Sequence, residues 1–214
     1  MVIQTVIFDL DGTLLYSLED LTDSVNFIME KYNFKQYSIS EVREAIGNGV
    51  RLLMERITPD DISEMTFEQC LSEFKEYYSA NMYNKTKPYD GVLDMLKKLR
   101  EDVYKIAVLS NKFDVAVKEL CDKYFGDLVD IAVGQKEGVD EKPSPLGVFE
   151  IAKELNTPVE NCIFVGDSEV DIQTANNAGI DCISVTWGYK DVDFLYKHGA
   201  SQLIYVPEDI LELL

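Results

Sequence analysis

An alternation of short β-type runs with amphipathic helical segments restricts the fold of this chain more than any other feature. The β-type runs are almost continuously apolar, which is typical of strands buried on both faces of a parallel sheet. Strand, helix and strand at this spacing predict βαβ units. We therefore expect an α/β protein with strands at 4–8, 104–109, 128–133, 161–165, 181–185 and 202–206, and with helices at 115–124, 146–155 and 169–178.

The stretch between the first two predicted strands is much longer than a crossover needs. It has about 95 residues, whereas a dozen or two are enough for a βαβ connection. Apolar residues recur at helical steps from Leu18 to Tyr32 and again from Phe67 to Tyr78. We expect a helical cap domain at 16–87, inserted into a core made of 1–15 and 88–214.

Two serines are predicted to begin helices of this cap. Ser17 is followed three residues later by Asp20, and Ser38 is followed at the same spacing by Glu41. A hydroxyl followed after three positions by an acid resembles a capping box, which satisfies the free amides at a helix N-terminus.

Composition excludes several classes of function. The chain has 39 acidic and 20 basic residues and a formal net charge of −19, so we expect no nucleic acid and no membrane surface as partner. No apolar run approaches the roughly 18 residues of a membrane span, and no signal peptide is recognisable. Four scattered cysteines and one histidine give no zinc spacing. A cytoplasmic protein with reduced thiols is expected.

Two aspartates follow the first predicted strand. Asp9 and Asp11 are separated by one residue, so on an extended chain their carboxylates point to the same side. They lie at the carboxyl end of a strand, which is where open α/β sheets carry their sites. Like charges this close need a cation or a proton between them. Gly12 permits a sharp turn after them.

Other predicted strands end in polar residues as well. Ser110 and Asn111 follow the second strand and offer hydrogen-bond donors to an anion. Lys142 lies in a proline-containing loop after the third strand, and Asp167 and Asp171 follow the fourth. Because parallel strands end at one edge of the sheet, these side chains are predicted to form one site.

These segments resemble a known family. D-L-D-G-T, L-S-N-K, K-P-S-P and V-G-D-S-x-x-D closely resemble the four motifs of the haloacid dehalogenase superfamily, in order and over nearly the whole chain. The inserted block, with I-G-N-G and the return P-Y-D-G-V, resembles the phosphoglycolate phosphatase-like branch. The resemblance implies a Rossmann-like core with a helical cap, dependence on Mg²⁺, and hydrolysis of phosphate monoesters of a small phosphorylated metabolite.

The resemblance also implies roles for the acids. Asp9 is expected to attack phosphorus and form an aspartyl-phosphate, and Asp11 to act as acid and then base. Mg²⁺ is expected on Asp9, the backbone carbonyl of Asp11, and Asp167. Asp171 is expected behind them, holding a metal-bound water or orienting Lys142.

The phosphate is expected to lie among four residues of the core. By the same resemblance, Ser110 and Lys142 are catalytic groups that hold the phosphoryl oxygens. Gly12 and Asn111 are expected to contribute to phosphate binding as well.

Substrate choice is predicted to depend on the cap segment from Gly47 to Arg56. Gly47, Asn48 and Gly49 let backbone amides approach a ligand, and Arg56 can hold a carboxylate through two hydrogen bonds. The alternative is that the glycines only form a turn between helices and that the arginines pair with surface acids.

Other activities of the superfamily are weighed against this one. A phosphosugar mutase has a cap histidine where this chain has Leu21. A dehalogenase needs no acid at Asp11. A pyrophosphatase, or a phosphate-binding module without turnover, would keep much of the same core.

Overall fold

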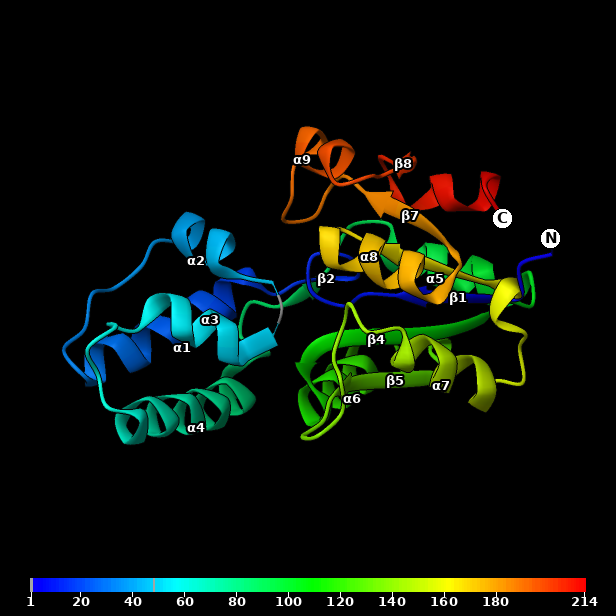
Figure 1. Ribbon diagram of the computed structural model, residues 1–214. Helices are drawn as coiled ribbons and strands as arrows, with labels where there is room; N and C mark the ends of the chain where they lie inside the picture. Colours follow the sequence, from blue (N-terminus) through cyan, green and yellow to red (C-terminus); the bar gives the residue numbers. More distant parts are fainter. Residues whose placement is uncertain (1, 48) are drawn as a thin grey trace.

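The computed structural model describes residues 2–47 and 49–214. The chain forms an α/β core and a separate group of helices at one end of it (Figure 1). In the described residues the core sheet has six strands in the order β5-β4-β1-β6-β7-β8, and every neighbouring pair is parallel. The strands are β1 Thr5–Phe8, β4 Lys105–Phe113, β5 Ile131–Gln135, β6 Cys162–Gly166, β7 Asp181–Val185 and β8 Gln202–Ile204. The predicted parallel α/β sheet is confirmed.

Helices cover both faces of this sheet. Along β1, Val6 and Phe8 belong to the apolar cluster shared with α5 and α6, while Ile7 belongs to the cluster shared with α7 and α8. Alternate side chains of one strand point to opposite faces, so a strand buried on both must be apolar throughout. The core helices are α5 Val92–Glu101, α6 Asp114–Tyr124, α7 Leu146–Glu154, α8 Glu169–Ala178 and α9 Val192–Lys197, with short 3-10 turns at Gly126–Leu128, Val159–Asn161 and Pro207–Glu212.

The inserted block is helical. It contains α1 Leu18–Lys31, α2 Ile39–Ala45, α3 Gly49–Ile57 and α4 Glu64–Asn81. Helix α2 begins with the predicted capping box, in which Ser38 and Glu41 exchange side-chain and backbone hydrogen bonds. The box predicted at Ser17 is wrong, because the Ser17 hydroxyl makes no cap hydrogen bond and donates to Asp11 instead.

Two short strands connect this cap to the core. β2 Leu15–Tyr16 and β3 Lys87–Pro88 pair antiparallel. Beside them the buried Asp20 carboxylate accepts hydrogen bonds from the backbone amides of Lys85 and Thr86 and from the Thr86 hydroxyl. Asp20 thus ties α1 to the returning chain. We propose this ribbon as the boundary between cap and core.

None of the helices in the described chain is both long and apolar enough to cross a membrane.

Candidate active site

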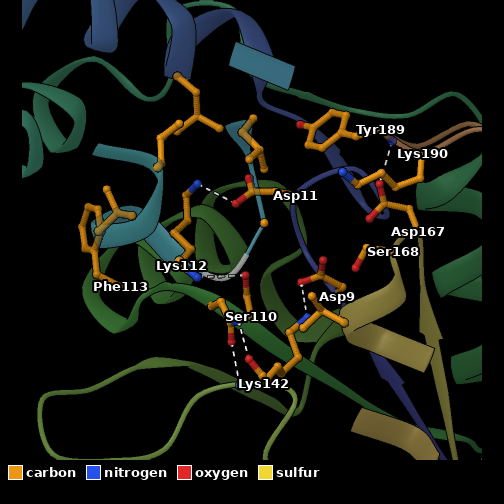
Figure 2. Close-up of a pocket in the computed structure, with 18 of the residues that line it drawn as sticks. Asp9, Asp11, Ser110, Lys112, Phe113, Lys142, Asp167, Ser168, Tyr189 and Lys190 are labelled. Carbon is orange, nitrogen blue, oxygen red and sulfur yellow. Dashed lines mark hydrogen bonds and ion pairs between the residues drawn. The ribbon is translucent and has the colours of Figure 1, made fainter. Parts of the chain in front are cut away.

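The candidate site lies where the carboxyl ends of β1, β4 and β6 meet. These strands are adjacent and parallel, so the loops that follow them converge at one edge of the sheet. A cavity opens there between the core and the cap. Asp9, Asp11, Ser110, Lys142 and Asp167 all line it, as the close-up shows (Figure 2). The prediction that the ends of separate strands meet in one place is confirmed.

Lys142 connects two of the predicted acids. Its Nζ lies 2.9 Å from Asp9 Oδ1 and 2.7 Å from Asp171 Oδ1. The second Asp171 oxygen accepts hydrogen bonds from the amide and hydroxyl of Ser168, at 3.1 Å and 2.6 Å. Asp171 is fully buried and engaged at both oxygens, so its position suits orientation of Lys142.

Burial and crowding change the acidity of this cluster. Burial raises the pKa of Asp9 to about 6, although the nearby Lys142 ammonium acts against that rise. Burial, together with the neighbouring carboxylates of Asp171 and Asp9, holds the pKa of Asp167 well above its ordinary value. One ammonium therefore does not balance three buried carboxylates.

This imbalance fits a divalent cation. Asp9, Asp167 and Asp171 each offer an oxygen, and these oxygens all lie within 4.8 Å of one another. Hard carboxylate oxygens are the ligands that Mg²⁺ prefers. The turn at Gly12 makes room for the cluster, because Gly12 has φ of +86° and a Cβ there would overlap the Asp167 carboxylate.

Asp11 lies in a different environment from Asp9. The Ser17 hydroxyl donates to Asp11 Oδ1, and Lys112 Nζ donates to Oδ2 at 2.7 Å. Figure 2 shows the Asp11 carboxylate directed toward Lys112. Asp9 and Asp11, which are separated by one residue, thus have different hydrogen-bond partners, as two acids with different roles require.

Strand β4 presents its polar residues where its pairing is irregular. The register of β4 against β5 shifts between Leu109 and Phe113. Irregularities of this kind in strand pairing redirect side chains near functional sites. Ser110 and Asn111 both line the cavity, and the Asn111 side chain also exchanges two hydrogen bonds of 2.8 Å with the backbone of Lys142.

Two of the residues expected to bind phosphate, Asn111 and Gly12, make other hydrogen bonds in this conformation. The Asn111 side-chain amide positions the Lys142 loop from the edge of the cavity. The backbone amide of Gly12 donates to the carbonyl of Leu15 at 2.9 Å, because the turn after Asp11 closes on itself.

The cap contributes a largely apolar wall. Its described residues in the wall are Leu21, Ile46, Gly47, Gly49, Val50, Leu53, Phe74 and Tyr78. The predicted glycines Gly47 and Gly49 are thus at the cavity, whereas the predicted Asn48 lies outside the described residues.

Arg56 is placed differently from the expectation. Its guanidinium donates to the backbone carbonyls of Ala45 at 2.7 Å and Gly47 at 3.3 Å, and it is not among the residues that line the cavity. Helix α3 turns this side chain toward the end of α2. In this conformation Arg56 supports the glycine segment and makes no direct contact with the cavity.

Residues without a predicted role also build the site. Lys112 belongs to the same motif as Ser110, but its pairing with Asp11 joins positions 101 apart in sequence. The backbone amide of Tyr189 donates to Asp167 Oδ2 at 2.6 Å, and the Tyr189 hydroxyl contacts Ser17. The available signals were the motif that contains Lys112, near the end of β4, and the position of Tyr189 after β7.

A cap residue also holds the Tyr189 loop. Arg43 Nε donates to the Tyr189 carbonyl at 2.5 Å, and a second guanidinium nitrogen reaches the Gly188 carbonyl at 3.5 Å. The cap is therefore seated on the same loop that orients Asp167.

Comparison with known proteins identifies the family. Residues 6–185 match the family described as haloacid dehalogenase-like hydrolase. The chain belongs to this family. Phosphoglycolate phosphatase 1 of Pseudomonas aeruginosa is 35% identical over 190 residues, which are 86% of this chain and 70% of that protein. The phosphoglycolate phosphatase of Aquifex aeolicus is 30% identical over 187 residues, covering 87% and 86% of the two chains.

A solved structure is also similar to this haloacid dehalogenase-like hydrolase over the whole chain. A protein from Lactobacillus delbrueckii subsp. bulgaricus, provisionally assigned as a phosphoglycolate phosphatase, superimposes with a TM-score of 0.94 at 34% identity. It covers 100% of this chain and 98% of that one. The resemblance drawn from the four motifs is confirmed, and with it the assignment to the phosphatases.

Proposed function

We propose that this chain is a Mg²⁺-dependent phosphate monoesterase that acts on a small phosphorylated metabolite of the phosphoglycolate type through an aspartyl-phosphate on Asp9. The observation that carries the proposal is the buried group of Asp9, Asp167 and Lys142 beside a cavity that the cap covers. The names of the relatives support the same substrate class.

Asp9 is the proposed nucleophile. Lys142 holds its Oδ1 at 2.9 Å, which leaves Oδ2 to attack phosphorus. The P–O bond to the leaving group breaks as the Asp9–phosphorus bond forms, and water later hydrolyses the acyl phosphate. Asp171 fixes the Lys142 ammonium so that it can hold the phosphoryl oxygens next to Ser110.

Asp11 is the proposed acid and base. Its carboxyl group gives a proton to the leaving oxygen and then takes one from the attacking water. The hydrogen bonds from Ser17 and Lys112 fix its orientation.

The metal would be held by Asp9, the backbone carbonyl of Asp11, and Asp167, with Asp171 behind them. When bound, Mg²⁺ supplies positive charge that offsets the carboxylates and the phosphoryl oxygens. The Tyr189 amide that donates to Asp167 Oδ2 then orients this ligand.

The cap supports a hydrolase rather than a phosphosugar mutase. Leu21 lines the cavity at the position where the mutase branch has a histidine. His198, the single histidine of the chain, lies at the end of α9 with its ring on Phe194. The described residues of the cap wall include no histidine.

Phosphate release tests the proposal. The protein should hydrolyse 2-phosphoglycolate and p-nitrophenyl phosphate with Mg²⁺ and lose activity in excess chelator. Asp9→Asn should lower kcat at least a thousandfold, about 4 kcal/mol, because it removes the attacking oxygen. Asp94→Asn, on the exposed surface of α5, is the matched control. Full activity in chelator, or a substantial kcat in Asp9→Asn, would overturn the proposal. Faster release from pyrophosphate than from any monoester would favour the pyrophosphatase alternative.

A further inference from the structure

The cavity contains a buried ammonium group with donor capacity to spare. Lys112 is only 8% exposed and lines the cavity at the end of β4. Among the described residues its Nζ has one hydrogen-bond acceptor, Asp11 Oδ2 at 2.7 Å. An ammonium carries three N–H groups, and a buried charge is costly unless it is well paired. Lys112 therefore has room for a second anionic partner.

The other two lysines of the cavity are placed differently. Lys142 already contacts two carboxylates, those of Asp9 and Asp171. The Lys190 ammonium lies 5.1 Å from the centre of the Phe194 ring, and its side chain follows Tyr189 on the Asp167 side of the site. Lys112 is thus the cation on the Asp11 side of the cavity.

Apolar rings limit what can approach Lys112. Its ammonium lies 4.6 Å from the centre of the Tyr78 ring, and Tyr78 stacks with Phe74 on the same helix, α4. Both rings line the cavity. In such low-dielectric surroundings an ammonium attracts an anion more strongly than in water.

We propose that Lys112 determines specificity for the leaving group by binding the carboxylate of a short phosphorylated 2-hydroxy acid. This inference rests on the proposed function, because it takes Asp11 as the proton donor to the leaving oxygen. That oxygen must come within hydrogen-bond reach of Asp11. Lys112 is hydrogen-bonded to the same Asp11 carboxyl group. A carboxylate one carbon away from the leaving oxygen therefore comes within reach of the Lys112 ammonium.

The charged groups of the site fit a substrate whose second anionic group, besides the phosphate, is a single carboxylate. The described cap residues of the wall carry no charged side chain, so the core must supply the cation for an anionic leaving group. A single ammonium is a point charge that suits a monoanion. A second phosphate would favour an arginine, whose planar guanidinium can donate two hydrogen bonds to it. No arginine is among the described residues that line the cavity.

Two substrates of nearly equal size test the assignment. 2-Phosphoglycolate carries a carboxylate where 2-hydroxyethyl phosphate carries a neutral hydroxymethyl group. The wild type should prefer 2-phosphoglycolate in kcat/KM, and Lys112→Met should lower the ratio between the two substrates at least tenfold. Lys112→Arg keeps the charge and should keep most of the ratio. Lys97→Met, an exposed lysine on α5, is the matched control and should leave the ratio unchanged.

The outcomes separate this inference from the proposed function. An equal fall of kcat/KM on both substrates in Lys112→Met would mean that Lys112 acts only through Asp11, and would overturn the inference. So would a wild type without preference for the carboxylate. The proposed function fails separately, if neither substrate nor p-nitrophenyl phosphate releases phosphate with Mg²⁺. Thermal melting checks the fold of each variant, and Lys112→Gln carries the same test if Lys112→Met does not fold.

Discussion

The two sides of the cavity are built by different rules. The core side carries all of its charged groups, which come from the ends of strands that pair through backbone hydrogen bonds. The cap side, in the described residues, is made of aliphatic and aromatic side chains and two glycines. We therefore expect the chemistry to depend on groups whose positions the sheet fixes, and the cap mainly to exclude water and limit the size of the substrate.

The difference also shows in the hydrogen bonds. Lys142 has two carboxylate partners and a backbone held by Asn111, so the core group is rigidly placed. The cap meets the core through separate polar contacts, such as the hydrogen bond from Arg43 Nε to the carbonyl of Tyr189. Substitutions on the core side should therefore change rates, and those in the cap should change selectivity.

After the loss of the nucleophile Asp9, the largest effect on kcat is expected at Asp11. Asp11→Ala should lower kcat on 2-phosphoglycolate at least a hundredfold, because a poor alkoxide leaving group needs a proton. The loss should be much smaller on p-nitrophenyl phosphate, whose leaving group departs readily without one. Steady-state kinetics on both substrates measures this contrast. Equal losses on both would place Asp11 in metal binding or folding rather than in proton transfer.

The next effect concerns stability. The pKa of Asp9 is raised to about 6 from an ordinary 3.8, so the folded chain binds this proton more tightly than the unfolded chain. Stability of the metal-free protein should fall as pH rises between these values. A pKa shift of about two units means that ionised Asp9 costs the folded protein about 3 kcal/mol at neutral pH. Asp9→Asn removes this cost, but part of the gain is lost because Lys142 loses a partner.

Asp9→Asn should therefore stabilise the metal-free protein at pH 7.5 by about 2 kcal/mol, with no gain below pH 4. Urea denaturation in chelator measures it, with Asp94→Asn as control. A variant less stable than the wild type at pH 7.5 would mean that pairing with Lys142 outweighs burial.

A smaller effect is expected in the apolar wall. Val50→Ala removes two methyl groups at the cavity. The ratio of kcat/KM for 2-phospholactate to that for 2-phosphoglycolate should rise about tenfold, since space for one methyl group is worth roughly 1–3 kcal/mol. An unchanged ratio would show that Val50 does not bound the leaving group.

The smallest effect is expected at Arg56. It holds the carbonyls of Ala45 and Gly47 from an exposed position. Arg56→Ala should lower kcat/KM about threefold, equally on 2-phosphoglycolate and 2-hydroxyethyl phosphate, as expected for loss of one modest hydrogen bond. A selective loss on the carboxylate substrate would restore Arg56 as a direct ligand.

Much of the core could be predicted from sequence because its logic is local. Asp9 and Asp167 directly follow apolar strands, Ser110 follows the apolar part of β4, and the carboxyl ends of parallel strands meet at one edge of the sheet. The position of Lys142 in the site was predicted from its place in the K-P-S-P motif. The pairing of Lys112 with Asp11 joins distant segments, so no spacing in the sequence indicates it.

Predictions for the cap were weaker for a physical reason. Helical periodicity finds an apolar face but does not say which neighbour that face meets. Arg56 is on the helix expected to approach the substrate, yet its side chain turns to the end of α2. At Ser17, the carboxylate of Asp11 competed successfully with the helix amides for the hydroxyl.

The ribbon of β2 and β3 has a consequence for how such a chain acquires and keeps its cap. At the proposed boundary the chain leaves the core at Leu15 and returns at Pro88, and these two residues are paired neighbours. An insertion whose ends already lie side by side adds little strain to its host, and each doubling of its length costs only about 0.6 kcal/mol in loop-closure entropy. The helices between these points can thus be lengthened, shortened or replaced during evolution while β1 and β4 stay in register. The architecture thus allows the cap, and with it the substrate specificity, to be exchanged while the core and its charged groups are retained.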